Sequence, residues 1–167
     1  DKTIESILHQ EFRLSFEVIV IGLDKYHLLE KYKNEVTFIN TETPVHPGTA
    51  RNIGVSNSKG SYILFIDSDA IAHPNLLENH LKAHRNHNGI IVGGAVTFPN
   101  KPYLTLCDNI ATFHEYMPHI PKSTKRMVPT INMSIERKNF LKVGGFNNNI
   151  AGEDTDLANR ASNIGIQ

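Results

Sequence analysis

The chain has 167 residues, 40% of them hydrophobic, which is enough for the core of one domain. The 17 Lys and Arg residues balance the 17 Asp and Glu residues, so bulk charge gives no drive to bind nucleic acid or an anionic membrane. The single cysteine, Cys107, excludes an internal disulfide and a cysteine-based zinc site, and it is expected to be a small buried hydrophobe. No apolar run in this chain approaches the length of a membrane-spanning segment.

Short apolar runs alternate with amphipathic segments along the chain. In chain order, the pattern predicts a helix near residue 4, a strand at 17–21, a helix at 25–33, a strand at 36–39, a helix from Pro47 to before Gly60, a strand at 61–66, a helix from Pro74, a strand at 89–98, a helix at 103–117, a mobile loop at 118–129, a strand at 131–135, a helix at 136–143, a loop at 144–152 and a helix at 154–163. This alternation predicts an α/β fold whose mainly parallel, mixed sheet is flanked by helices in one domain over residues 1–167. Ligands of such sheets bind beyond the carboxyl ends of the strands.

The first candidate site is Asp67-Ser68-Asp69, which directly follows an apolar strand. Side chains at positions i and i+2 of an extended segment point the same way, so both carboxylates can face one cation. Mg²⁺ and Mn²⁺ prefer oxygen ligands of this kind. The alternative interpretation is an acidic turn that only ends a strand.

The second candidate is the acidic cluster Glu153, Asp154 and Asp156 after Gly152, at a predicted helix start. A carboxylate among other acids can have a raised pKa and serve as a general base. Alternatively, the acids complement the helix dipole, and Asp156 forms a surface ion pair with Arg160 four residues on.

The third candidate is the helix start at Pro47 and Gly48, which carries Arg51 and can receive a phosphate or a nucleotide. An ordinary amphipathic helix with an exposed arginine is the alternative. His80 and His84 share a helix face at a spacing that suits zinc. However, no Glu follows His80 as a metalloprotease motif requires, so a solvated helix face is the favoured interpretation.

The order of these segments is more specific than any one of them. The segments are G-T-A-R-N-I-G at 48–54, K-G-S-Y-I-L-F-I-D-S-D at 59–69, N-M-S-I-E-R at 132–137, V-G-G-F at 143–146 and G-E-D-T-D-L at 152–157. Together they resemble family-2 glycosyltransferases of the GT-A fold, and the resemblance spans nearly the whole chain. It implies the inverting transfer of a sugar from a nucleotide-sugar donor, UDP-linked by default, to an acceptor hydroxyl.

The resemblance also implies roles for individual residues. Asp69 would hold Mn²⁺ or Mg²⁺, and Asp67 would bind the metal or the ribose. Asp154 would deprotonate the acceptor hydroxyl, and Glu153 would help to position the acceptor. The glycines at 144–145 would let the backbone approach the sugar closely.

The nucleotide side would include Arg51. The family usually has an acidic pair directly after its second strand, where Gly22 and Leu23 stand in this chain, with Asp24 one step later. Asp24 is therefore a candidate for nucleotide binding, while the identity of the base is left open.

The family's first strand would precede Thr3, and a further strand with a metal-binding His would follow Gln167. The implied acceptor is a glycan, a lipid-linked compound or another hydroxyl compound, chosen through residues 99–129. The implied setting is bacterial-type polysaccharide or glycoconjugate biosynthesis in the cytoplasm, with the inner face of the membrane as an alternative.

Two other functions compete with this interpretation. A phosphatase of the haloacid dehalogenase type also carries Asp-x-Asp after an apolar strand, although Ile71 stands where that family prefers Thr or Val. The other alternative is a non-catalytic fragment that binds nucleotide sugars.

Overall fold

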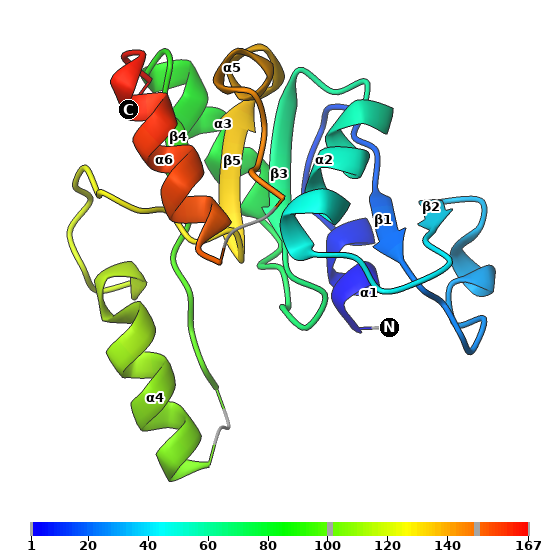
Figure 1. Cartoon of the computed structure of the whole chain (residues 1–167). Coiled ribbons are helices and arrows are strands. Elements are labelled where there is room, and N and C mark those ends of the chain that lie inside the picture. The colour runs from blue at the N-terminus through cyan, green and yellow to red at the C-terminus, as the bar shows by residue number, and fades with distance from the viewer. Residues whose placement is uncertain (1, 100–101, 149–150, 167) are drawn as a thin grey trace.

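The computed structural model describes residues 2–99, 102–148 and 151–166 of the chain (Figure 1). The predicted loop at 144–152 includes residues 149–150, which lie outside the described residues, as do Asp1, Gln167 and residues 100–101. The elements in chain order are α1 (Lys2–Leu8), β1 (Ile19–Gly22), the 3₁₀ turn η1 (Glu30–Tyr32), β2 (Thr37–Asn40), α2 (Pro47–Asn57), β3 (Tyr62–Ile66), α3 (Leu76–Asn86), β4 (Ile91–Gly93), α4 (Tyr103–Phe113), η2 (His114–Tyr116), β5 (Asn132–Glu136), α5 (Arg137–Val143) and α6 (Glu153–Asn163).

The strands form a parallel pair and a three-stranded sheet. β1 pairs with β2 in parallel, whereas β5 lies between β3 and β4 and is antiparallel to both. β3 and β4, which α3 connects, therefore run in the same direction. The mixed α/β fold is confirmed, but the sheet is less parallel than the alternation predicts. The chain reaches β5 through α4 and a loop instead of one crossover helix, and this route does not force a parallel strand.

The main core fills the space between the β3–β5–β4 sheet and the helices α2, α5 and α6. Its fully buried members include Ile135 on β5 and Leu157 on α6. The rings of Phe65, Phe140 and Phe146 pack with centroids 5.2–5.7 Å apart. Burial of one such side chain contributes about 1.5–3 kcal/mol to the free energy of folding. Through Leu157, the same core holds α6 against the sheet.

Three predicted elements are shorter than expected. The helix expected at 25–33 is reduced to η1, because the Asp24 carboxylate accepts hydrogen bonds from the amides of Leu28 and Leu29 and forms a turn there. The strand expected at 89–98 ends at Gly93, and the helix expected at 103–117 divides into α4 and η2.

Helix α4 extends away from the rest of the molecule (Figure 1), and none of its residues is buried. Cys107 lies on this helix and is exposed, so the expectation of a buried hydrophobe is wrong. Across the part of the chain that the structure describes, every helix is too short or too polar to span a bilayer.

Candidate active site at the ends of β3 and α6

Arg51 joins the segments that the sequence analysis singled out. It lies in the first turns of α2, which begins at Pro47 after the His46 ring accepts a hydrogen bond from the Gly48 amide. Its Nη1 donates to Glu153 Oε1 at 2.7 Å, and its Nη2 donates to Asp67 Oδ1 at 3.0 Å. One guanidinium therefore connects the carboxyl end of β3 with the start of α6, residues that are far apart in the sequence.

Asp67 and Asp69 lie in a turn, and not in the extended segment that the spacing argument assumes. The Ala70 amide donates to the Asp67 carbonyl at 3.1 Å and closes this turn. Asp69 is exposed, while Asp67 is half-buried beside Arg51. The two carboxylates still project from one short turn, but the reason is the turn and not strand alternation.

Helix α1 anchors the turn after β3, a role that the sequence analysis missed. The Thr3 hydroxyl donates to the Ser68 carbonyl at 2.8 Å, and the Ser6 hydroxyl accepts from the Ala72 amide at 2.9 Å. Just after the helix, Gln10 Nε2 donates to the His73 carbonyl, and Gln10 Oε1 accepts from the Leu77 amide. The helical spacing of Thr3, Ser6 and Gln10 is a sequence signal for a polar face, but it does not reveal the partner of that face.

Asp154 lies at the start of α6, after Gly152 adopts a left-handed backbone with φ +79°. Its Oδ1 accepts a hydrogen bond from the Thr155 amide at 2.7 Å. Burial, together with the charges of Glu115 and Asp154, raises the pKa of the Tyr116 phenol. Nothing in the sequence pattern had singled out Tyr116 on η2.

The Gly144–Phe146 turn is held from two sides. The Asn52 side chain on α2 exchanges hydrogen bonds with the Phe146 backbone at 2.8 and 2.9 Å. Arg160 on α6 donates to the Val143 and Gly145 carbonyls and to Asp156, so the predicted Asp156–Arg160 ion pair is confirmed. Gly145 has φ +73°, and a Cβ there would lie 2.8 Å from Asn52 Oδ1, which explains the glycine.

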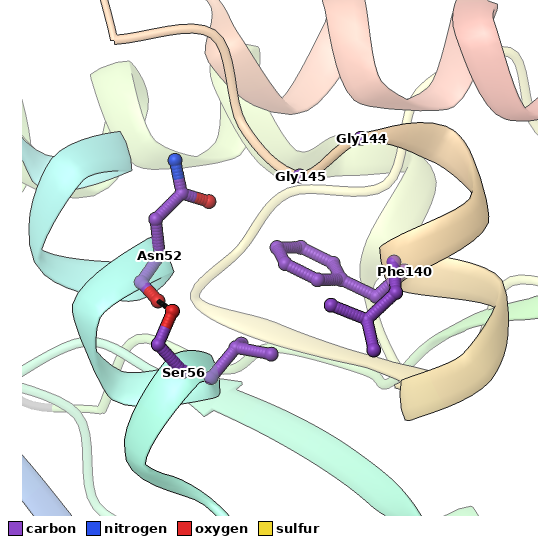
Figure 2. Close-up of a pocket in the computed structure, with 7 residues that line it drawn as sticks. Asn52, Ser56, Phe140, Gly144 and Gly145 are labelled. Carbon is purple, nitrogen blue, oxygen red and sulfur yellow. Dashed lines mark hydrogen bonds between the residues drawn. The ribbon is translucent and has the colours of Figure 1, made fainter.

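A cavity of about 270 Å³ lies between α2 and the segment that ends α5 (Figure 2). It is lined by Asn52, Val55, Ser56, Phe140, Leu141, Gly144 and Gly145. Arg51, the strand-end carboxylates and the α6 carboxylates are not among these residues. Gly144 and Gly145, the glycines predicted to lie beside the sugar, therefore line this cavity, whereas Arg51, Asp67 and Glu153 meet outside its lining.

Asp24 is held in the turn that follows β1. Hydrogen bonds from the Leu29 and Leu28 amides, at 2.8 and 2.9 Å, lower the pKa of its carboxyl group. The structure thus gives Asp24 a turn-forming role after β1, and its binding to a nucleotide stays a prediction.

The turn that carries Asp67 and Asp69 offers oxygen donors of the kind that divalent metals bind. Over residues 2–99, 102–148 and 151–166, no three or more His, Cys, Asp or Glu side chains form a group that could hold a metal ion. Asp67 and Asp69 nevertheless offer hard oxygen donors from one turn. Mg²⁺ and Mn²⁺ commonly use one or two protein carboxylates together with water and substrate phosphates, so these residues fit such an ion.

Solved structures support the fold. The S. aureus TarS structure (residues 1–349, in complex with UDP) has a TM-score of 0.72 and 18% sequence identity, and the match covers 96% of this chain and 50% of TarS. The mannosyltransferase PcManGT from Pyrobaculum calidifontis, in complex with GDP-Man and Mn²⁺, has a TM-score of 0.73 and 14% identity, with 99% and 48% of the two chains covered. Both neighbours are glycosyltransferases of the GT-A type, so this fold is confirmed.

Sequence comparison gives the family. The uncharacterized glycosyltransferase YfnE of Bacillus subtilis is 33% identical over 95 residues, which are 53% of this chain and 24% of YfnE. The chain thus spans about half or less of the proteins it resembles. The family model "Glycosyl transferase family 2" matches residues 1–141. With its Arg51-linked carboxylates and its GT-A architecture, the chain belongs to glycosyl transferase family 2.

Proposed function

We propose that this domain transfers a sugar from a nucleotide-sugar donor to an acceptor hydroxyl with inversion at the anomeric carbon. The observation that carries the proposal is the bridge from Arg51 to Asp67 and Glu153. It places the candidate donor-binding acids and the candidate acid–base residues at one edge of the sheet, where ligands of α/β folds bind.

Asp67, Asp69 and Arg51 form the proposed donor side. Asp67 and Asp69 would hold Mn²⁺ or Mg²⁺, and such an ion neutralises negative charge on a departing nucleoside diphosphate. Arg51 supplies a fixed positive charge on the same side, because two carboxylates and the Phe146 ring, 5.7 Å from its central carbon, hold its guanidinium in place.

Asp154 is the proposed general base. Its carboxylate would accept the proton of the acceptor hydroxyl while the acceptor oxygen forms a bond to the anomeric carbon. The bond to the nucleoside diphosphate breaks on the opposite face, which gives inversion. Glu153, held by Arg51, would help to orient the acceptor. A positioned base of this kind contributes about 10²–10⁴-fold to a rate.

The donor base is the least constrained part of the proposal. The TarS structure contains UDP and the PcManGT structure contains GDP-Man, so relatives of this fold accommodate either base. We propose a UDP-linked sugar as the default donor. We also propose a cytoplasmic location, with the inner face of the membrane as the alternative, and the single cysteine is compatible with both.

Calorimetric titration with UDP and GDP, each with and without Mn²⁺, tests the donor side. We expect Mn²⁺-dependent binding that Asp69→Asn weakens and Asp154→Asn leaves intact. Turnover of nucleotide sugars should fall about 10²-fold or more in Asp154→Asn. Glu35→Gln likewise replaces a carboxylate by an amide, at an exposed position just before β2 that has no assigned role, and should match the wild type.

The same experiment distinguishes sugar transfer from the remaining alternative, a non-catalytic fragment that binds nucleotide sugars. A non-catalytic fragment would bind the nucleotide but show no transfer and no effect of Asp154→Asn. Membership of family 2 leaves the haloacid dehalogenase alternative without support.

A further inference from the structure

The segment that leads from β3 into α3 carries Asp67 and Asp69, and α1 with the residues just after it runs alongside this segment (Figure 1). Three side chains of this N-terminal stretch form hydrogen bonds with the segment: Thr3, Ser6 and Gln10. A fourth contact joins the two backbones, since the Glu11 amide donates to the Pro74 carbonyl at 2.8 Å. Residues 68–74 are therefore bonded to α1 and the turn after it from one end to the other.

Both ends of this segment are fixed against β5. Before it, Ile66 pairs with Asn132. After it, His80 and His84 on α3 are only 6% and 3% exposed, so the expectation of a solvated helix face is wrong. The Ser134 hydroxyl lies 2.7 Å from His80 Nδ1 and 2.8 Å from His84 Nε2, and Asn132 Oδ1 lies 2.8 Å from His80 Nε2. The sheet therefore sets the two ends of the segment, and α1 holds the backbone between them.

Thr3 and Ser6 act on the turn after β3 through its backbone. Ser68 stands between Asp67 and Asp69. Its carbonyl accepts from the hydroxyl of Thr3, a side chain on a residue that is buried. The Ser6 hydroxyl donates to the Thr3 carbonyl at 2.7 Å, so the two residues form one connected set. Because the backbone of Ser68 joins the two aspartates, this set restricts the orientation of both carboxylates.

The opposite face of α1 is buried against the side of the molecule that carries β1 and β2. Ile4 packs there in a cluster with Tyr32 and Val36. Leu29, whose amide donates to the Asp24 carboxylate, packs against the same cluster. Helix α1 thus contacts the segment that follows β1 with one face and bonds the turn after β3 with the other.

The two turns that α1 connects both follow the carboxyl ends of strands, where ligands of α/β folds bind. Over the described residues, β1 and β3 belong to different sheets, so their separation depends on the elements that pack between them. A nucleoside diphosphate that contacts both turns needs them at a fixed separation. Such preorganisation reduces the entropy that is lost when the ligand binds.

We infer that Thr3 and Ser6 are positioning residues for the donor: their hydroxyls hold the turn after β3 so that Asp67 and Asp69 meet the metal ion and the diphosphate, at a separation from the turn after β1 that α1 sets. The inference rests on the proposed function, because it takes the turn after β3 as the donor side. Loss of either hydroxyl should weaken Mn²⁺-dependent nucleotide binding without removing a group that touches the nucleotide.

Calorimetric titration with UDP and with GDP, in the presence of Mn²⁺, tests the Thr3 hydroxyl. Thr3→Val keeps the shape of the side chain and removes its donor, whereas Thr3→Ser keeps the donor. We expect the Kd to rise about tenfold in Thr3→Val and to stay within about twofold of the wild type in Thr3→Ser, because groups that orient metal ligands contribute about 10–100-fold to affinity. A loss of folding stability alone does not change the Kd of the folded chain.

Ser6→Ala has a matched control in Ser58→Ala. Each hydroxyl donates to the carbonyl three residues earlier, at 2.7 Å for Ser6 and 2.8 Å for Ser58. Only the Ser6 hydroxyl of this pair also accepts from the Ala72 amide in the turn after β3. We expect Ser6→Ala to raise the Kd about tenfold and Ser58→Ala to leave it unchanged. This pair gives the same test if Thr3→Val does not fold.

A second measurement needs no ligand. The Ala70 amide closes the turn by donating to the Asp67 carbonyl at 3.1 Å, so its hydrogen exchange reports opening of this turn. The exchange should be about fivefold faster or more in Thr3→Val and in Ser6→Ala. Thr3→Ser and Ser58→Ala should keep the wild-type rate.

The outcomes separate the two proposals. An unchanged Kd in Thr3→Val and Ser6→Ala would overturn the positioning role, even where Ala70 exchanges faster, and so would equal effects of Ser6→Ala and Ser58→Ala. Failure of the wild-type chain to bind either nucleotide with Mn²⁺ would refute the proposed donor side instead. The Ala70 exchange rates would then still decide whether the two hydroxyls hold the turn.

Discussion

Arg51→Met removes the guanidinium that pairs with Asp67 and Glu153, and the burial of these side chains sets the expected loss of folding stability. The Arg51 and Glu153 side chains are 17% and 15% exposed, whereas that of Asp67 is 38% exposed. Breaking a buried ion pair costs about 3–5 kcal/mol, and breaking a surface pair costs about 0–1 kcal/mol. For these partly buried groups we expect the free energy of unfolding to fall by about 2–3 kcal/mol, chiefly because the Glu153 carboxylate loses its partner.

Urea denaturation of double-mutant cycles tests this assignment. The cycle of Arg51→Met with Glu153→Gln should give a coupling energy of about 1–2 kcal/mol, and the cycle with Asp67→Asn about 0.5 kcal/mol. The exposed pair of Glu78 and Lys82 on α3 is a matched control, for which we expect at most about 0.5 kcal/mol.

The ranking of the coupling energies is the critical result. Equal coupling energies for Glu153 and Asp67, or values no larger than that of the α3 pair, would refute the view that Arg51 is the connection between β3 and α6. Arg51→Lys should lose most of the coupling as well, because a lysine cannot present two parallel donors to two carboxylates.

Three further predictions concern the surroundings of the site. Gly144→Ala should lower the free energy of unfolding by about 1–2 kcal/mol, because the backbone there is left-handed. Gly145→Ala should lower it more, because its Cβ would also lie 2.8 Å from Asn52 Oδ1. Thermal unfolding of the two variants checks this order. Thr3→Val removes the hydrogen bond that anchors the turn after β3 and should lower the free energy of unfolding by about 1–3 kcal/mol in urea. The folded pKa of His80, about 4, lies below its ordinary value of 6.5, so the unfolded chain binds more protons between these values. Stability should therefore fall as the pH drops from 6.5 toward 4, by up to about 1.4 kcal/mol per pH unit, and His80→Gln should lack this component in urea titrations at pH 7, 6 and 5.

The secondary structure could be predicted best where local patterns coincide with burial. The apolar run ending at Ile66 and the helix after Pro47 both form close to the expected residues. The prediction of a helix at 25–33 was wrong because the Asp24 carboxylate accepts hydrogen bonds from backbone amides that would lie in that helix. Hydrophobic periodicity gives no information about such local hydrogen bonds. The sequence made no prediction of the direction of β5, since strand direction depends on the path of the chain and not on its residues.

The candidate site could be predicted as a set of residues but not as an arrangement. The sequence selected Asp67, Arg51 and Glu153 separately, and the structure shows that a single guanidinium joins them. The polar face of α1 and Tyr116 gave no specific signal, because their partners lie more than ten residues away in the chain.

By itself, the sequence determined the family, the order of the elements and the acids available for chemistry, because motifs and periodicity are local properties of the chain. Only the tertiary structure decided the state of His80 and His84. The same i, i+4 spacing suits a solvated face, a zinc site or a buried hydrogen-bond chain. Packing of α3 against β5 selected the last, since Ser134 and Asn132 meet the two rings there and exclude water from them.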